Sequence, residues 1–461
     1  MPPTVKLSSL LWLCLSVLCS LNFQQRAALA MSPVQRVVLP NQLVLLISEE
    51  HSLPFVTLQL LVDAGSWRDP SGEEGLASLT AKGLLLGTST HTSTAIQEEL
   101  DFMGASLTAA AQKDYATLHL QVLKKDLDRG LELFMEVLTQ PIFPDDEVHR
   151  EVEKTLATMQ AEEDQPEEVA EKAFQQALFP ANPYGHPVEG TPASIVKLTR
   201  EAMVRFYQSY YHPNHVILAV VGDSSAEEVW TKLSARLSAW PMGDIPAATF
   251  GSAFASGPKT ITIDRDLAQA HIILGHIGMS RENPDFEALS VMNYLLGGGG
   301  FASRLVEEIR DKRGLAYSVA SFFEADKFPG SFQIVLQTKN TSAQEAISLA
   351  LQQMQRLRSE LVPEQELEVA KKALIGSFPR RLATQAQLAS FFTRVEYYGL
   401  GLDYPTKYPA LIASITSQEV QRVAQMYLHP QHSICVIVAN LREASLLSPS
   451  QEGSTTKTGC R

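Results

Sequence analysis

Cysteine is scarce in this sequence, with four residues among 461. Small proteins held together by disulfides carry a far higher share, so that class is excluded. Cys14 and Cys19 fall in an N-terminal segment described below, which leaves Cys435 and Cys460. Cys435 lies in the apolar run 434–438, which predicts a buried strand with a core thiol. A disulfide between Cys435 and Cys460, one residue from the C-terminus, is the alternative.

The sequence also lacks an excess of basic residues. Its 38 Lys and Arg against 51 Asp and Glu give a net charge of −13, and no basic stripe stands out. This balance argues against nucleic acid or an anionic membrane surface as a partner. An apolar fraction of 45% with 19% charged residues is ordinary for a folded globular protein.

Long hydrophobic runs are missing as well. The apolar run 10–23 is shorter than the roughly 20 residues that a spanning helix needs. Lys6 precedes it, and the small-residue segment 28–30 follows it. This pattern predicts a signal peptide at 1–30 and export to the periplasm or a comparable lumen. The polar residues 24–26, between the run and the cleavage site, leave an uncleaved membrane anchor open.

The chain repeats itself on either side of a predicted linker. Residues 241–260 are rich in Pro, Gly and small residues. Tyr-His-Pro-Asn-His at 211–215 corresponds to Leu-His-Pro-Gln-His at 428–432, and each precedes a strand-like run. A second pair at nearly the same offset, 143–148 and 362–367, has Pro followed by acidic residues, which is typical of helix starts. The histidine-proline segments have no neighbouring carboxylate, which favours turns over metal sites. We predict an internal duplication.

Both halves mix strands with helices. Segments 43–47 and 55–63 are rich in β-formers, whereas 95–103 and 195–210 have helical spacing. The predicted fold class is α+β, with two homologous α+β domains, each a mainly antiparallel sheet covered by helices. The predicted organisation is a signal peptide at 1–30, an N-terminal domain at 31–240, the linker at 241–260, a C-terminal domain at 261–445 and a polar tail at 446–461.

Ala-Gly-Ser-Trp-Arg-Asp-Pro at 64–70, followed by Gly-Leu-Ala at 75–77, resembles the pitrilysin/insulinase metallopeptidase family, which includes the mitochondrial processing peptidases. In active members the next helix carries His-x-x-Glu-His, in which the two histidines bind zinc and the glutamate is the base. Here Ser78 and Lys82 stand at the histidine positions, and Ala81 stands at the base position.

The resemblance also implies a third zinc ligand, a glutamate eight residues before the proline of an Asp-x-Pro element. That proline is Pro166, so the ligand position is Thr158, while a further family glutamate corresponds to Glu151. With three ligand positions lost, we expect no zinc and no other cofactor in this chain. Without a metal, we expect Glu151 to lie on a solvated helix face.

The second half resembles the family more closely. The stretch 295–319 matches the family's second-half signature, in which an Arg and a Tyr seven residues later contact the substrate. The resemblance implies that Arg310 and Tyr317 serve catalysis in trans. The alternative is a surface charge and a core aromatic. The glycine-rich loop, which lacks the Gly-Lys-Ser/Thr of a phosphate-binding loop, is expected to bind substrate through Gly297, Gly298, Gly299 and Gly300.

These features predict a non-zinc subunit of a heterodimeric metallopeptidase that forms half of a clam-shell dimer. Its partner would be a homologous zinc-bearing subunit with His-x-x-Glu-His, and its substrates would be peptides or unfolded segments. A catalytically inactive scaffold or peptide-binding homologue is the alternative from another class. A homodimer also stays open.

Overall fold

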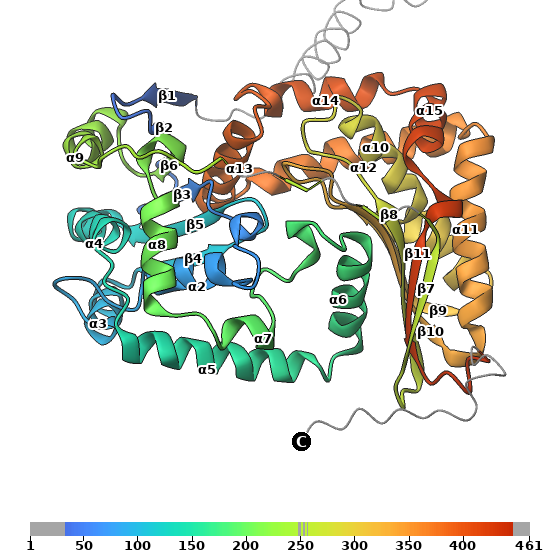
Figure 1. Ribbon diagram of the computed structural model, residues 1–461. Coiled ribbons are helices and arrows are strands. Elements are labelled where there is room, and N and C mark those ends of the chain that lie inside the picture. The colour runs from blue at the N-terminus through green and yellow to red at the C-terminus, as the bar shows by residue number, and fades with distance from the viewer. Residues whose placement is uncertain (1–32, 248–249, 252–253, 256, 446–461) are drawn as a thin grey trace, which may run out of the picture.

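The computed structural model describes residues 33–247, 250–251, 254–255 and 257–445, which form two α+β halves (Figure 1). The predicted α+β class is confirmed. The predicted signal peptide at 1–30 and the predicted polar tail at 446–461, which contains Cys460, lie outside the described residues. Within them, Cys435 is buried in a strand, as predicted, and its pairing with Cys460 stays untested. No helix in this described part is both long and apolar enough to cross a membrane.

The first sheet has six strands in the order β1-β2-β6-β3-β5-β4. β2 and β6 are parallel, and every other neighbouring pair is antiparallel. β3 is buried along nearly its whole length because helices cover both faces of the sheet's centre. The strands are β1 (Val34–Val38), β2 (Val44–Glu49), β3 (Phe55–Val62), β4 (Ser106–Ala111), β5 (Ala116–Leu123) and β6 (Val216–Gly222).

The second sheet repeats this plan. Its order is β7-β11-β8-β10-β9, with β7 and β11 parallel and the other pairs antiparallel. Replacing each strand by its counterpart in chain order gives β2-β6-β3-β5-β4, so the topology agrees with the predicted duplication. The strands are β7 (Lys259–Asp264), β8 (Gln269–Ile277), β9 (Ala316–Phe323), β10 (Ser331–Lys339) and β11 (Ile434–Ala439).

The helices follow the same repeat. Pro144 and Pro363 are the N-caps of α5 (Asp145–Glu162) and α12 (Glu364–Ser377), and acidic residues occupy both first turns, as the paired motifs predicted. The histidine-proline segments form short 3₁₀ turns, η4 (Pro213–His215) and η10 (Pro430–His432), directly before β6 and β11. The predicted helix at 195–210 is interrupted, because Thr199 caps a new helix at Arg200.

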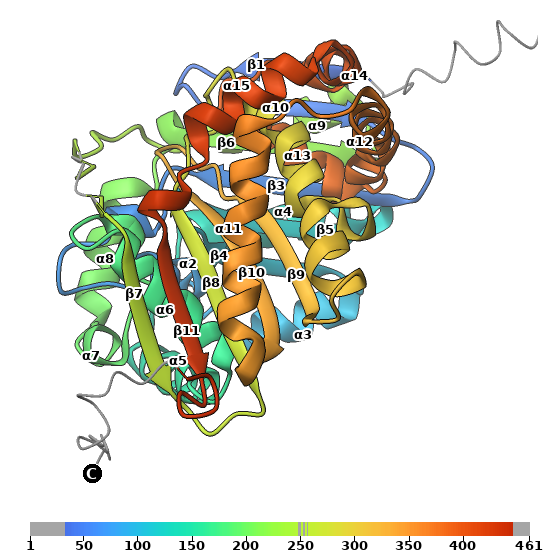
Figure 2. The same cartoon turned by 90° about the vertical axis from the view of Figure 1, so that its right-hand side faces the viewer.

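The helices of the first half are α2 (Leu76–Gly83), α3 (Ser93–Met103), α4 (Leu127–Thr139), α5 (Asp145–Glu162), α6 (Pro166–Leu178), α7 (Pro192–Ile195), α8 (Arg200–Tyr210) and α9 (Ala226–Ser238). Those of the second half are α10 (Phe286–Asn293), α11 (Ala343–Ser359), α12 (Glu364–Ser377), α13 (Gln385–Tyr397), α14 (Tyr404–Ser414) and α15 (Ser417–Tyr427). Figure 2 shows α11 lying across one face of the second sheet.

One helix of each half packs against the sheet of the other half. α6 contacts β8 and β11, and its buried Phe174 packs with Ile273 and Val436 of the second sheet. α13 contacts β3 and β6, and Leu46 and Ala219 of the first sheet belong to the second half's core. Figure 1 shows α6 and α13 between the two sheets. The two halves therefore bury apolar surface against each other as well as within themselves.

Three polar contacts also join the two halves. The backbone N–H of Lys327 donates to Asp114 Oδ2 at 2.7 Å, and the Lys327 ammonium lies 3.0 Å from Asp63 Oδ2. The hydroxyl of Tyr398 donates to Asp114 Oδ2 at 2.9 Å. Because Asp63 and Asp114 belong to the first half and Lys327 and Tyr398 to the second, these bonds fix the orientation of the halves.

Candidate functional site

The positions that the family resemblance assigns to zinc ligands lie on α2 and α5. α2 begins after Gly75, whose φ of 97° is left-handed. The Asp69 carboxylate accepts backbone hydrogen bonds from Gly75 at 2.8 Å and Ala77 at 2.7 Å, which satisfies exposed amides of the first turn. Burial raises the pKa of Asp69 well above its ordinary value.

Lys82 and Glu151 face each other across these helices. The Lys82 ammonium lies 3.8 Å from Glu151 Oε1, and the Lys154 ammonium lies 3.4 Å from Glu151 Oε2. The Glu151 side chain is only 12% exposed. The prediction of a solvated Glu151 is therefore wrong, because the carboxylate is partly buried and balances the charge of Lys82.

The other degenerate positions provide no substitute ligand. Ala81 is fully buried and has no group that could move a proton. The hydroxyl of Thr158 donates to the Lys154 carbonyl at 3.1 Å, within its own helix. An ammonium repels a dication, so the donors at this position do not fit zinc. Among the described residues, no three His, Cys, Asp or Glu side chains are grouped as metal ligands.

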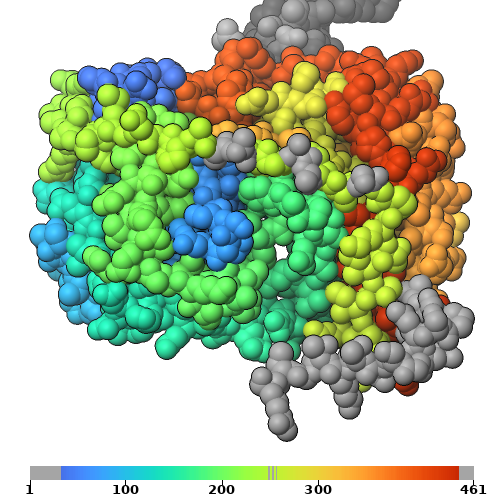
Figure 3. Space-filling view, in the orientation of Figure 1, coloured from blue at the N-terminus to red at the C-terminus, as the bar shows by residue number. Residues whose placement is uncertain are grey.

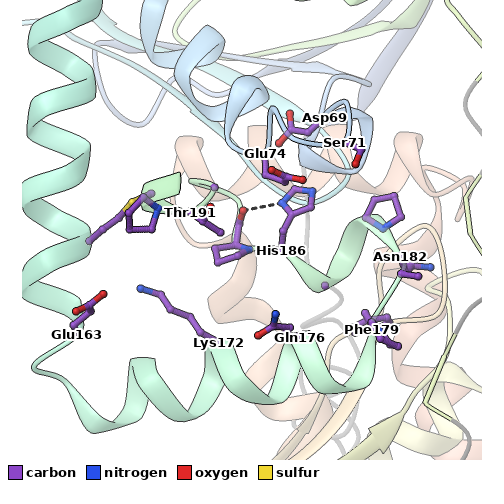
Figure 4. Close-up of a pocket in the computed structure, with 18 residues that line it drawn as sticks. Asp69, Ser71, Glu74, Glu163, Lys172, Gln176, Phe179, Asn182, His186 and Thr191 are labelled. Carbon is purple, nitrogen blue, oxygen red and sulfur yellow. Dashed lines mark hydrogen bonds between the residues drawn. The ribbon is translucent and has the colours of Figure 1, made fainter. Parts of the chain in front are cut away.

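Two cavities adjoin this region. One of about 390 Å³ is lined by Lys82, Glu151 and Thr158, and also by Met159. Met159 contributes in addition to a larger cavity of about 770 Å³, outside the predicted site. Figure 4 shows side chains of the larger cavity, including Lys172 and Gln176 from α6 and the nearby His186.

Two polar side chains that line the larger cavity, His186 and Lys172, are already neutral or paired. Burial lowers the pKa of His186, so this imidazole is neutral at pH 7, and its Nδ1 donates to the Pro187 carbonyl at 2.9 Å. The Lys172 ammonium lies 2.7 Å from Glu162 Oε2 and is thus already paired. Figure 3 shows the surface hollowed among the green segments that contain these residues.

Arg310 and Tyr317 come together on the second half. Arg310 lies on η7 (Val306–Asp311), a π-helical segment, and its guanidinium carbon is 5.7 Å from the ring centre of Tyr317 on β9. Tyr317 is 76% exposed, so the alternative of a core aromatic is wrong. The Arg310 guanidinium makes no hydrogen bond or ion pair with the side chains described here. Neither residue lines the cavity around Lys82.

The glycine-rich segment 297–300 runs from the end of η5 (Tyr294–Gly298), a second π-helical segment, into the 3₁₀ turn η6 (Gly300–Ala302). π-Helical segments are frequent at functional sites. A Cβ on Gly297 would lie 2.6 Å from the Ser321 backbone nitrogen, and one on Gly298 or Gly299 would also lie less than 3 Å from its neighbours. Gly300 has open space and a φ of +58°. Close packing thus explains three glycines, and substrate binding by the loop stays a prediction.

One exposed residue of this loop was not singled out from the sequence. Phe301 is 74% exposed, and the guanidinium carbon of Arg310 lies 4.7 Å from its ring centre. The only signal in the sequence is a large apolar side chain within a run of small residues.

Comparison with known proteins identifies the family. The model for the insulinase family, peptidase family M16, matches residues 44–192, and the model for the peptidase M16 inactive domain matches residues 197–374. The chain belongs to the insulinase (peptidase M16) family. The first matched segment lies within the first half, and the second runs from just before α8 of the first half into α12 of the second.

Curated zinc proteases match over most of the chain. An uncharacterized zinc protease of Streptomyces coelicolor is 27% identical over 412 residues, covering 88% of this chain and 89% of its own. One from Mycobacterium leprae is 26% identical over 420 residues, covering 90% and 93%. A crystal structure of a peptidase M16 inactive domain from Pseudomonas fluorescens superimposes with a TM-score of 0.82 at 28% identity, covering 88% of this chain and 98% of that one. A Helicobacter pylori protease, at 20% identity, also has a TM-score of 0.82 and shows the fold alone.

Proposed function

We propose that this M16 chain is the non-zinc subunit of a heterodimeric metallopeptidase. A homologous subunit with an intact His-x-x-Glu-His motif holds the zinc, and this chain contributes Arg310 and Tyr317 to the partner's site. The two subunits close as a clam-shell around peptides or unfolded segments. The N-terminal segment directs the chain to the periplasm or a comparable lumen.

The contrast between the two halves carries this proposal. In the first half, the Lys82–Glu151 pair stands at the degenerate metal position. In the second half, Arg310 and Tyr317 are adjacent, and their donors face no competing acceptor among the described side chains. A chain that keeps substrate-binding donors without a metal site can act only on a substrate held by another subunit.

The chemistry of the pair fits this role. A guanidinium and a phenol are donors suited to a carbonyl oxygen that gains negative charge during hydrolysis. Donors held in position before the reaction need no reorganisation when the charge develops. The exposed position of Tyr317 allows contact with a peptide bound outside this chain.

The test mixes the purified chain with its zinc-bearing homologue and follows cleavage of a fluorogenic peptide mixture. Hydrolysis should require both subunits. Tyr317→Phe removes one donor and keeps the ring, while Arg310→Ala removes the charge. Each variant should lower turnover by about 10²–10³-fold, as expected for a lost oxyanion donor. Size-exclusion chromatography of the same fractions should show intact complexes.

Three results would contradict the proposal in different ways. Normal turnover in both variants would favour the scaffold or peptide-binding alternative. Hydrolysis by this chain alone would show that it carries a complete site. Loss of the complex in either variant would show that these side chains are structural.

A further inference from the structure

Phe301 is held in a fixed place although most of its surface is exposed. The hydroxyl of Ser303 donates to the Gly300 carbonyl at 2.6 Å, and the Ser303 N–H donates to the same oxygen at 2.9 Å. Arg304 then makes two bonds to the Glu366 carboxylate, at 2.8 and 2.9 Å. These bonds close the turn that contains Phe301 and anchor its C-terminal end to α12.

The guanidinium of Arg310 is bordered by two aromatic rings. Its carbon lies 4.7 Å from the ring centre of Phe301 and 5.7 Å from that of Tyr317. Attraction to a ring face uses the positive charge and leaves the N–H donors free. An ion pair with a carboxylate would instead occupy those donors.

The neighbouring carboxylates are engaged elsewhere. Glu308 lies 2.6 Å from the Lys312 ammonium and 2.7 Å from Arg313, and Glu307 lies 2.9 Å from Lys312. Glu307 and Glu308, which lie on the same segment as Arg310, are thus neutralised by later cations. Phe301 is the nearer of the two rings that contact the Arg310 guanidinium without using its N–H donors.

We infer that Phe301 is a positioning residue, which holds the Arg310 guanidinium beside Tyr317 by stacking against it. The inference rests on the proposed function, because positioning matters only if Arg310 contacts the substrate. The aromatic face should matter more than the apolar area, since only the ring attracts the cation through its π-electrons.

Three variants of Phe301 test this in the mixed complex with the fluorogenic peptide mixture. Phe301→Ala and Phe301→Leu should each lower kcat/KM by roughly 3–30-fold, the range for a cation–π contact. Phe301→Trp should retain activity near that of the wild type. Phe102→Ala is the matched control, because Phe102 is 86% exposed on α3 and should leave kcat/KM unchanged.

A double-variant cycle then shows whether Phe301 acts through Arg310. If it does, adding Phe301→Ala to Arg310→Ala should change kcat/KM by less than about 2-fold, because the contact is already lost. Full multiplication of the two losses would overturn the inference. So would wild-type activity in Phe301→Ala or equal losses in all three Phe301 variants.

A crystal structure of Phe301→Ala supplies a readout that needs no partner. The Arg310 side chain should be displaced or disordered, and an unchanged guanidinium would overturn the inference. Failure of the proposed function looks different, because Arg310→Ala and Tyr317→Phe would then leave turnover unchanged. If those two variants lose turnover while Phe301→Ala does not, only the positioning role fails.

Discussion

Replacing Asp326 by Asn should stabilise the folded chain above neutral pH. Asp326 directly precedes Lys327, which joins the two halves. The pKa of the Asp326 carboxyl is raised from 3.8 to about 7. Burial is the main cause, and the neighbouring Asp114 and Glu324 raise the pKa further against the opposing effect of Lys113. Asn resembles the protonated carboxyl in shape and carries no charge, so it removes the ionisation without opening a cavity.

The direction of the pH dependence follows from proton binding. Between about pH 4 and pH 7 the folded chain keeps a proton on Asp326 that the unfolded chain has already lost. The stability contributed by this protonated carboxyl is therefore full at about pH 4 and is lost as the pH rises through 7. At about 1.36 kcal/mol for each pH unit, the loss is up to about 4 kcal/mol at pH 8.

Urea denaturation followed by tryptophan fluorescence between pH 4.5 and 8 measures this difference. The urea midpoints of wild type and Asp326→Asn should diverge as the pH rises, with the variant more stable by roughly 2–4 kcal/mol at pH 8. Asp244→Asn, at an exposed position, should follow the wild type throughout. Parallel curves for wild type and Asp326→Asn would refute the reasoning.

Three further predictions concern metal, loop and core. The dialysed chain should hold no stoichiometric zinc by atomic absorption. The double variant Ser78→His with Lys82→His should not gain hydrolysis, because Ala81 remains at the base position and Thr158 at the third ligand position. Gly297→Ala should lower stability by about 1–3 kcal/mol through overcrowding. Gly376→Ala, with open space on α12, should be neutral or stabilising in the same urea assay. Phe174→Ala should cost about 3–5 kcal/mol, and unfolding of the first half alone would contradict its role in joining the halves.

The larger part of the fold could be predicted from the sequence. Segments 43–47 and 55–63 became β2 and β3, because branched apolar residues suit buried strands. The paired proline motifs marked the starts of α5 and α12, where local geometry and charge decide the outcome. The break at Thr199 was missed because the apolar pattern continues through it.

The candidate site was predicted less completely, since its contacts join distant segments. The residue types alone show that Ser78, Lys82 and Thr158 stand where the family resemblance places zinc ligands. The pairing of Lys82 with Glu151 could not be predicted, because the two residues are 69 positions apart and meet only when α5 packs against α2. Phe301 was not singled out from the sequence, and only the tertiary structure places it in a turn closed by Ser303 and beside Arg310.

The sequence by itself determined the paired motifs of the two halves, the strand-forming runs and the residue types at positions 78, 82 and 158, because these depend on residue type and short-range periodicity. Only the tertiary structure decided that α6 packs on the second half's sheet and α13 on the first half's sheet. It also decided that Lys327 bridges Asp63 and Asp114. An apolar helix face is equally suited to its own half's sheet or to the neighbouring one. Which sheet it covers is settled by the packing of the whole chain, where the two halves bury each other's remaining apolar surface.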